Sequence, residues 1–193
     1  MSSSKDTFPS NYSADFFEGK FSDLDLDWPG DMTKSIYQNG ADYTTALLSG
    51  DTQITGNPLA HLWVSSTMTD GDFFLFLEDI DPDDVSHYVS HGVIRASRRA
   101  PFTPEWDNQG LPYHRDFRQD RKALIPDQPA QLDFALGPTS YVFAAGHRIR
   151  ITITTSAGKA FQSLAFFPAP EISIYHDSKY ASYVTLPLMP AAP

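Results

Sequence analysis

Hydrophobic and polar residues alternate strictly near the middle of the C-terminal half. Three isoleucines stand at every second position, with arginine or threonine between them: Arg148, Ile149, Arg150, Ile151, Thr152, Ile153 and Thr154. Because successive side chains of a strand point to opposite faces, this pattern predicts a strand with one buried face and one solvated face. A Gly-His turn at residues 146–147 and a short apolar run at 141–143 precede it. The arrangement is typical of an antiparallel β-protein.

Short segments of similar character follow one another from residue 42 onward. We predict strands at residues 59–64, 72–78, 87–91, 93–96, 132–136, 172–175 and 183–186. The segment 72–78 is largely apolar on both faces, which is typical of a strand covered on two sides. Five prolines make residues 98–129 a long irregular excursion. The predicted fold is therefore all-β: an antiparallel β-sandwich of jelly-roll type with a long proline-rich excursion.

Residues 1–41 differ from the rest of the chain. They are serine-rich at the start, strongly acidic at 23–31, and contain an apolar set: Phe16, Phe17, Phe21, Leu24, Leu26 and Trp28. We interpret them as a partly mobile N-terminal arm or linker that packs either on its own domain or on something missing from this chain. Residues 42–193 then form the β-sandwich domain.

Composition narrows the class of protein. A chain of 193 residues is long enough for one domain with a sizeable core. The absence of cysteine excludes disulfides, thiolate metal sites and a cysteine nucleophile. No apolar run is long enough for a membrane-spanning helix, and the polar N-terminus lacks the apolar segment of a secretory signal. We expect no membrane partner, and the compartment stays open with the cytoplasm slightly favoured.

Charge is distributed unevenly. The net charge of −10 divides into −13 for residues 1–84 and +3 for residues 85–193. Such an acidic chain would repel phosphate backbones, so we expect no nucleic-acid partner. One interpretation is a pair of faces, one of them suited to a charged partner. The favoured interpretation is that acidic and basic strands lie side by side and neutralise each other.

Motifs for catalysis or metal binding are weak. The Gly-x-Ser-x-Gly elbow is absent, and the Ser-x-x-Lys match at residues 156–159 lies at a strand end, where its side chains would not share a helical face. His87 and His91 would stand about 13 Å apart on a strand, too far for one zinc ion. The acidic segment 78–84 lacks the glycine and glutamate of an EF-hand, so we read it as a solvated turn. We therefore predict no catalytic residue, no metal and no cofactor.

The binding candidates come from the excursion. Trp106, Tyr113 and His114 could line a pocket or an interface, or could equally seal the edge of the sandwich. The other histidines, His61, His147 and His176, have no acid or base partner that is visible in the sequence.

Ten segments in a fixed order resemble the C-terminal, non-catalytic domain of the X-Pro dipeptidyl-peptidase and cocaine-esterase-like serine hydrolases. They are residues 43–47, 54–58, 62–66, 70–74, 77–83, 91–97, 110–114, 138–139, 146–150 and 186–188. Each is short, but their order and spacing extend over about 145 residues. The family's acidic turn usually continues Asp-Pro-Asp-Gly, whereas Asp84 stands here in place of the glycine. That turn therefore needs a non-glycine residue at positive φ or a different geometry.

The resemblance implies a jelly-roll (galactose-binding-like) sandwich appended to an α/β-hydrolase domain. The family's catalytic serine, aspartate and histidine belong to the hydrolase domain, so none can be assigned to this chain. Residues 1–41 match nothing in that pattern and would correspond to the segment that joins the two domains, with Met1 then an artificial start. The expected partner is the missing catalytic domain, and a homo-oligomeric contact is a further candidate.

We therefore predict an accessory domain of a serine hydrolase that acts on acyl esters, amides or Xaa-Pro peptides. The domain would buttress the catalytic domain and border its substrate cleft, and alone it would be inactive. An alternative is a carbohydrate- or ligand-binding jelly-roll module, in which Trp28, Trp63 and Trp106 would stack on sugar rings. Trp63 lies in an apolar strand and is expected in the core. A third candidate is an interaction protein that dimerises through an exposed face.

Overall fold

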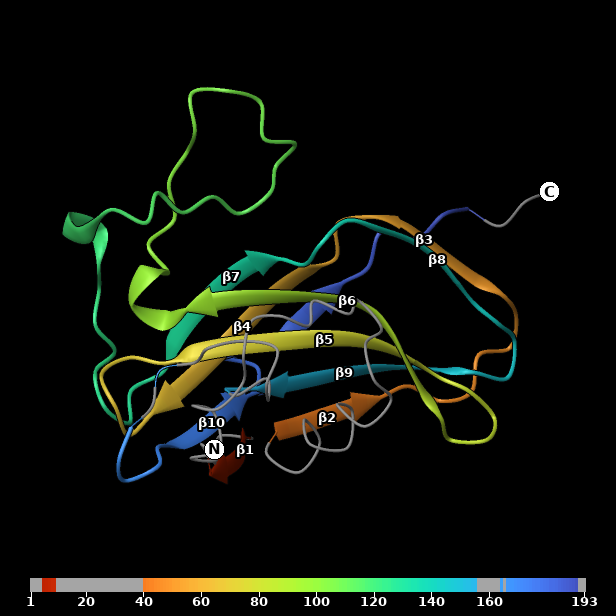
Figure 1. Ribbon diagram of the computed structural model, residues 1–193, viewed down its shortest axis with the longest axis horizontal. Helices are drawn as coiled ribbons and strands as arrows, with labels where there is room; N and C mark the ends of the chain where they lie inside the picture. Colours follow the sequence, from red (N-terminus) through yellow and green to blue (C-terminus); the bar gives the residue numbers. More distant parts are fainter. Residues whose placement is uncertain (1–4, 10–39, 156–163, 165, 191–193) are drawn as a thin grey trace, which may run out of the picture.

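The computed structural model describes residues 5–9, 40–155, 164 and 166–190 of the chain (Figure 1). The described part is built from eleven strands: β1 (Lys5–Pro9), β2 (Gly40–Thr44), β3 (Thr52–Gly56), β4 (Leu59–Ser66), β5 (Asp72–Ile80), β6 (Ser86–Arg95), β7 (Ala130–Ala135), β8 (Thr139–Phe143), β9 (Arg148–Thr154), β10 (Glu171–Tyr175) and β11 (Tyr183–Thr185). There are also two short 3-10 turns. η2 (Ala96–Arg98) directly follows β6, and η3 (Arg118–Asp120) lies within the excursion.

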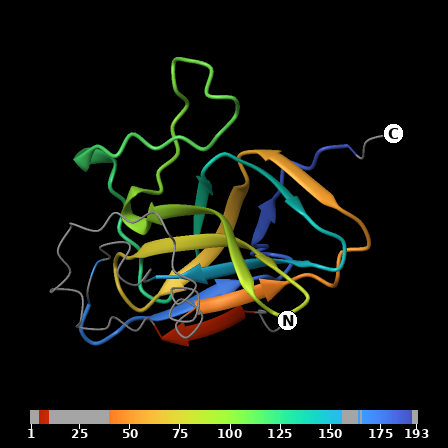
Figure 2. The same cartoon turned by 45° about the vertical axis from the view of Figure 1, so that its right-hand side comes forward.

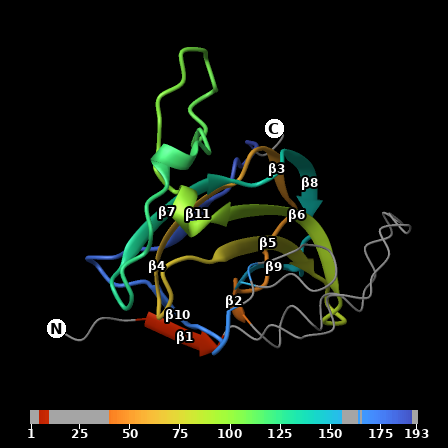
Figure 3. The ribbon, with the colours of Figure 1, turned by 60° about the vertical axis from the view of Figure 1, so that its left-hand side comes forward.

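The strands form two main antiparallel sheets and a small third one. One sheet has the order β1-β10-β4-β11, and β7 also pairs with β4. The second sheet has the order β2-β9-β5-β6. β3 and β8 pair separately. Figures 2 and 3 show the two sheets as layers, and buried side chains from both form one core. The predicted antiparallel all-β fold is confirmed, whereas the jelly-roll winding stays a prediction.

β5 is one of the two inner strands of its sheet and is buried along its whole length. Phe73, Leu75 and Leu77 join the core, and Phe74 and Phe76 on the opposite face are each only 2% exposed. The prediction of a strand covered on both sides is therefore confirmed. A strand that is covered on both faces needs apolar side chains at consecutive positions, and residues 73–77 supply them.

The prediction of a solvated face on β9 is wrong for its two threonines, while Arg148 and Arg150 on that face are partly exposed. Ile149 and Ile153 are buried as expected, but Thr152 and Thr154 on the other face are completely buried as well. Thr152 lies opposite Phe76 of β5, and its hydroxyl donates a hydrogen bond to Glu78 Oε2 at 2.7 Å. Threonine satisfies its only donor in this way, so its polarity did not require contact with water.

The acidic segment 78–84 is a solvated turn only in its second half. Glu78 and Asp79 belong to β5 and are 2% and 3% exposed, so the prediction is wrong for these two residues. The turn itself is closed by Asp81, whose Oδ1 accepts hydrogen bonds from the backbone N–H of Asp83 and of Val85, both at 2.9 Å. Asp84 has φ of 60°, so of the two alternatives the structure adopts the non-glycine residue at positive φ.

Acidic and basic side chains pair between neighbouring strands. Arg95 on β6 binds Asp72 on β5, and Arg148 on β9 reaches Asp84 at 2.8 Å. These contacts support the interpretation in which oppositely charged strands lie side by side.

Part of the N-terminal region belongs to the sheets. β1 pairs with β10, which the sequence did not predict, and β2 begins at Gly40 and so crosses the proposed boundary between residues 41 and 42. Trp28 and the acidic segment 23–31 lie outside the described residues. The division into a 1–41 arm and a 42–193 sandwich stays a prediction.

Candidate functional site

The excursion that links β6 to β7 is fixed firmly at its base. The N–H of Lys122 donates to the carbonyl of Ser97 at 2.7 Å, and the N–H of Leu124 donates to Thr69 at 2.7 Å. The Arg99 guanidinium donates to the carbonyl oxygens of three residues on both sides of the excursion, Ala96, Lys122 and Ala123. Partial burial, which disfavours the charged form, lowers the pKa of Arg99. The predicted irregular excursion is therefore confirmed, but its ends are held in place.

Residues 102–113 form an arm that stands away from both sheets in all three ribbon views (Figures 1, 2 and 3). Its two sides are joined where the N–H of Phe102 donates to the carbonyl of Tyr113 at 3.0 Å. Its tip is a tight turn in which Gln109 and Gly110 both have positive φ, 58° and 73°. No residue of the arm belongs to the buried core cluster of the described residues.

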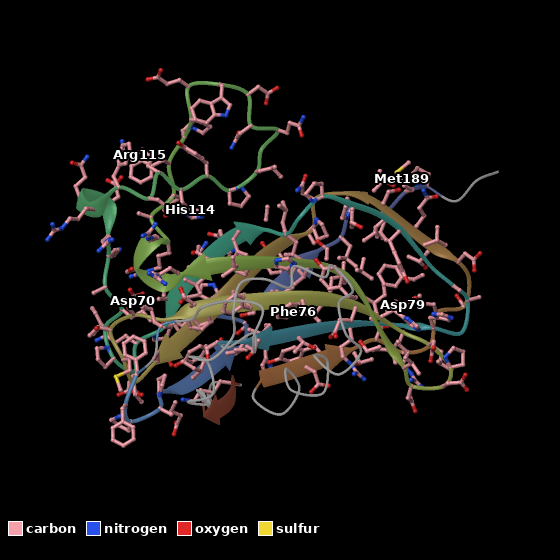
Figure 4. All side chains as sticks on the ribbon, viewed as in Figure 1. Asp70, Phe76, Asp79, His114, Arg115 and Met189 are labelled. Carbon is pink, nitrogen blue, oxygen red and sulfur yellow. The ribbon has the colours of Figure 1, made fainter. Side chains whose placement is uncertain are left out.

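The three predicted binding residues do not act together. Trp106 and Tyr113 meet edge-to-face within the arm with ring centroids 5.1 Å apart, and Trp106 is 59% exposed. His114 lies at the foot of the arm (Figure 4), where Nδ1 is 3.1 Å from the carbonyl oxygen of Ala100 and Nε2 is 2.7 Å from that of Asp133. A neutral imidazole has one N–H, so it donates to one of these two groups at a time. His114 therefore anchors the arm to β7, and Trp106 does not seal the sandwich edge. A binding role for the three residues stays a prediction.

A second aromatic and cationic group, which the sequence did not single out, lies beyond the arm. The Arg115 guanidinium stacks on Phe102 at 3.6 Å and lies 5.4 Å from the ring of Phe117. Two parallel hydrogen bonds of 3.0 and 2.7 Å join it to Asp120 (Figure 4 labels Arg115). Phe117 remains 57% exposed. The only sequence signal for this group was the presence of two arginines close to aromatic residues at 113–118.

Three cations next to this group form a basic ridge: Arg118, Arg121 and Lys122. All three are exposed, and none forms an ion pair within the described part of the chain. The exposed side chain of Ile125 lies just beyond them. The excursion of this otherwise acidic protein thus presents a surface that combines exposed aromatic rings with free cations.

A cleft of about 350 Å³ opens between the foot of the arm and β5 and β6. Its charged lining is already paired: Arg95 forms bidentate hydrogen bonds of 2.8 and 3.0 Å with Asp72, which raise the pKa of Arg95. Arg98 lies 3.4 Å from Asp116, and its Nε is buried without a hydrogen-bond partner in the described residues. His114 completes one wall.

A larger cavity of about 590 Å³ lies between the two sheets. Its walls are mostly apolar side chains of β2, β9, β4 and the C-terminal strands, including Tyr43, Ile151 and Leu186. The hydroxyl of Ser182 near its rim is already engaged, because it accepts from the N–H of Trp63 and donates to the carbonyl of Tyr175. Trp63 itself is only half-buried and packs on Tyr180 at 5.0 Å, so its expected place in the core is wrong.

Three histidines pair with carboxylates that the sequence did not reveal. His61 lies 2.6 Å from Asp133, His87 lies 2.9 Å from Asp81, and His147 lies 2.9 Å from Asp79. The partners are far apart in the sequence for His61 and His147, so only the fold brings them together. Within the described ranges, no hydroxyl group bonds to these three rings, and no three metal-binding side chains cluster. Residues 156–159, with the Ser-x-x-Lys match, lie outside those ranges.

No helix in the part of the chain that the structure describes combines the length and the apolarity that a membrane span requires.

Comparison with known proteins decides the family. The model of the X-Pro dipeptidyl-peptidase C-terminal non-catalytic domain matches residues 11–185. The chain belongs to this family. Two mycobacterial proteins, from Mycobacterium bovis and Mycobacterium tuberculosis, are each 39% identical over 150 residues, which is 76% of this chain and 23% of each relative. Both carry provisional names as serine esterases. The chain thus spans about a quarter of the length of these relatives.

Solved structures show the same fold within larger proteins. A CocE/NonD family hydrolase from Staphylococcus aureus matches 98% of this chain and 33% of its own with a TM-score of 0.69 at 18% identity. An aminopeptidase from a marine sediment Thaumarchaeota archaeon matches 98% and 34% with a TM-score of 0.70 at 16% identity. An α-amino acid ester hydrolase matches 78% and 26% with a TM-score of 0.64 at 20% identity. The domain described here is therefore the non-catalytic, C-terminal β-sandwich of this hydrolase family.

Proposed function

We propose that this chain serves as the accessory domain of a serine hydrolase that cleaves acyl esters. The catalytic serine, histidine and aspartate would lie on the hydrolase part of the same protein, and this domain would buttress that part and border its substrate cleft. The observation that carries the proposal is the 39% identity to two proteins named as serine esterases, of which this chain spans only 23%. Esters are preferred over Xaa-Pro peptides because these two mycobacterial relatives carry esterase names.

The polar groups of the domain support a non-catalytic role. Each histidine that has a carboxylate partner is bonded to that carboxylate and to no hydroxyl group within the described residues. In a serine hydrolase the histidine is bonded to the acid and also to a nucleophilic hydroxyl, whose proton it accepts, and this second partner is missing from the three pairs within the described residues.

Activity measurements on two proteins test this proposal. The isolated 193-residue chain and the full polypeptide that carries it behind its hydrolase part are incubated with short nitrophenyl esters and with Xaa-Pro anilides. We expect ester hydrolysis by the full polypeptide, its loss after treatment with a serine-directed inhibitor, and no turnover above buffer by the isolated chain. Inhibitor-sensitive turnover by the isolated chain would contradict the proposal, and faster cleavage of the anilides would contradict the substrate class.

A carbohydrate- or ligand-binding module is the second candidate. The exposed indole of Trp106, held edge-on against Tyr113, is a surface on which a sugar ring could stack. This function requires saccharide binding at about micromolar dissociation constants, with loss of binding after Trp106→Ala. A glycan array followed by calorimetry on the isolated chain decides it, and Val142→Ala, at another exposed apolar position, is the matched control.

A further inference from the structure

We infer that the excursion is the surface by which this domain docks onto the hydrolase part of its own polypeptide, and that the complementary surface is acidic around an apolar notch. The inference rests on the proposed function and adds the docking surface and the chemistry of its partner. The docking surface comprises Trp106 and Tyr113 of the arm, Phe117, and the basic ridge of Arg118, Arg121 and Lys122. His114, Arg99 and Arg115 act as positioning residues.

The arm is rigid before any partner binds. His114 attaches its foot to β7, Arg99 holds the two ends of the excursion together, and the Phe102 N–H to Tyr113 carbonyl hydrogen bond closes its neck. Edge-to-face packing against Tyr113 fixes the ring of Trp106. A surface ordered in advance loses little conformational entropy on binding, which favours association. These anchors would be superfluous in a loop that only connects β6 to β7.

The exposed side chains have the composition of an interface centre. Trp106 and Phe117 are 59% and 57% exposed, and Arg115 lies between Phe102 and Phe117. Tryptophan, tyrosine and arginine carry most of the binding energy in protein–protein interfaces, where they fill pockets of the partner. The apolar rings of the excursion remain in water within the described structure, so their burial is available to a partner.

Charge specifies the partner further. The basic ridge carries three cations without an ion pair among the described residues, whereas the nearby Arg95, Arg98 and Arg115 are paired with aspartates. The chain as a whole has a net charge of −10. A ridge of unpaired cations on such a molecule fits an acidic surface and would repel a second copy of the same ridge. We therefore assign the docking surface to the hydrolase part and not to a homodimer.

The length of the related proteins points to the hydrolase part as the partner of the docking surface. This chain spans 23% of its mycobacterial relatives and about a third of the matched hydrolase structures, so most of each such protein lies beyond it. A family defined as the C-terminal domain of larger hydrolases requires one face of the sandwich to meet the rest of the polypeptide. Among the described surfaces, the excursion combines exposed aromatic rings, free cations and a fixed backbone.

Cysteine labelling measures which face is covered. The chain has no cysteine of its own, so Glu105→Cys beside Trp106 and Gln119→Cys on η3 each introduce one reactive thiol. Val142→Cys is the matched control, because this side chain is half exposed and belongs to β8, which lies away from the arm at the other end of the molecule in Figure 1. Alkylation by iodoacetamide is followed by mass spectrometry of the three peptides, in the isolated chain and in the full polypeptide.

We expect alkylation at positions 105 and 119 to be about tenfold slower in the full polypeptide, because the docked surface must open before the thiol reacts. The rate at position 142 should be the same in both proteins. Equal rates at 105 and 119 in a full polypeptide that hydrolyses esters would overturn the docking surface and leave the proposed function intact. Absence of ester hydrolysis would instead refute the proposed function, and the labelling rates would still decide whether the excursion is covered.

Substitutions give a second readout. Trp106→Ala and the charge reversal Arg118→Glu with Arg121→Glu should each speed thermal inactivation of the full polypeptide about fivefold or more, because they remove the contacts that these side chains would gain on docking. Neither should shift the unfolding temperature of the isolated chain, since all three side chains are exposed there. The control Val142→Ala should change neither quantity. Unchanged inactivation in both test variants would contradict the inference.

Discussion

Asp79 connects β5 to two neighbouring segments through a buried hydrogen-bond network. Its carboxylate is 4% exposed and lies 2.9 Å from His147 Nδ1, and it accepts a hydrogen bond of 2.9 Å from the hydroxyl of Tyr141 on β8. Burial, reinforced by this hydrogen bond and by the charge of Asp79, raises the pKa of Tyr141 to about 12. The network satisfies an acid that would otherwise be costly to bury, and it fastens the small β3–β8 sheet to β5.

Replacing Tyr141 with phenylalanine tests this network. Tyr141→Phe should lower the free energy of unfolding at neutral pH by about 1–2 kcal/mol, because Asp79 loses one donor. The raised pKa means that the native state keeps the phenolic proton above pH 10 while the unfolded state releases it. Stability from this group is therefore present below the ordinary tyrosine pKa of 10 and is lost as the pH rises towards about 12.

Urea unfolding of both proteins at pH 7 and at several values between pH 10 and pH 12 measures the effect. The difference in unfolding free energy between wild type and Tyr141→Phe should shrink across this alkaline range. Packing of the ring against Phe143, 5.0 Å away, is kept by phenylalanine and so does not contribute to the difference. A difference that is constant with pH would show that the hydroxyl is not coupled to Asp79.

Local chemistry was predictable at this scale and long-range pairing was not. The departure from Asp-Pro-Asp-Gly was enough to reduce Asp84 to two alternatives, positive φ or a different turn geometry, because that backbone demand is set by neighbouring residues, and the structure has positive φ. His147 and Asp79 are 68 residues apart, and no periodicity connects them. We predicted Glu78 and Asp79 in a solvated turn because acidic side chains are usually exposed to solvent. In the structure both are buried, because Thr152 donates a hydrogen bond to Glu78 and Tyr141 donates one to Asp79.

At the scale of elements, the two sheets are in tight contact where β6 passes β7. Gly92 on β6 faces β7, and a Cβ atom there would lie 2.9 Å from the carbonyl oxygen of Ala135 and 3.0 Å from the ring of Phe134. Two hydrogen bonds close this seam: Ser90 donates to the carbonyl of Gly137 at 2.7 Å, and the N–H of Gly137 donates to His91 at 2.9 Å. The seam needs a residue without a side chain.

Gly92→Ala should therefore destabilise the domain by about 1–3 kcal/mol, the usual cost of overpacking a tight contact. Gly50→Ala is the matched control, because no atom lies within 4 Å of the position that its Cβ would take. Denaturant unfolding at pH 7 compares the two variants with wild type. Equal stabilities for both variants would mean that the seam relaxes freely and does not fix the distance between the sheets.

The excursion owes its order to Arg99. Arg99→Lys keeps the charge but cannot donate in the same plane to the carbonyls of Ala96, Lys122 and Ala123. We expect chymotrypsin to cut the variant faster at the aromatic residues of the arm, by about five- to tenfold, because local opening there becomes easier. The unfolding temperature should change little. Arg118→Lys, an exposed position, is the control, and an unchanged cleavage rate for Arg99→Lys would refute this anchoring role.

The sequence indicated the strands and the excursion but not what holds the excursion. Alternation and apolar runs mark β4, β5, β9 and β10, because burial demands repeat every second residue. The prolines marked residues 98–129 as irregular, yet the carbonyl acceptors of Arg99 and His114 carry no side-chain signature in the sequence. The candidate residues Trp106 and Tyr113 were found through their aromatic character, whereas the basic ridge emerged only from its exposure and lack of ion pairs in the structure.

At the scale of the whole molecule, strong negative charge and an exposed aromatic surface oppose each other. The net charge of −10 keeps copies of the isolated chain apart at neutral pH, and the sequence pI is about 4.8. Once that repulsion is removed, Trp106 and Phe117 on the docking surface would favour association with a different face of a second copy, because the basic ridge repels its own counterpart. The isolated domain should therefore be monomeric near neutral pH and self-associate near its pI.

Light scattering after size-exclusion chromatography at pH 7.5 and at pH 5 tests this balance. We expect a monomer at pH 7.5 and dimers or larger species at pH 5, since near the pI short-range apolar contacts are no longer offset by charge repulsion. The double variant Trp106→Ser with Phe117→Ser should remain largely monomeric at pH 5, whereas Val142→Ser should associate like the wild type. If the double variant associates as strongly as wild type, another face is responsible, and the excursion is not the most adhesive surface of the isolated domain. Association confined to the excursion would place the exposed apolar contact where the hydrolase part is expected to dock.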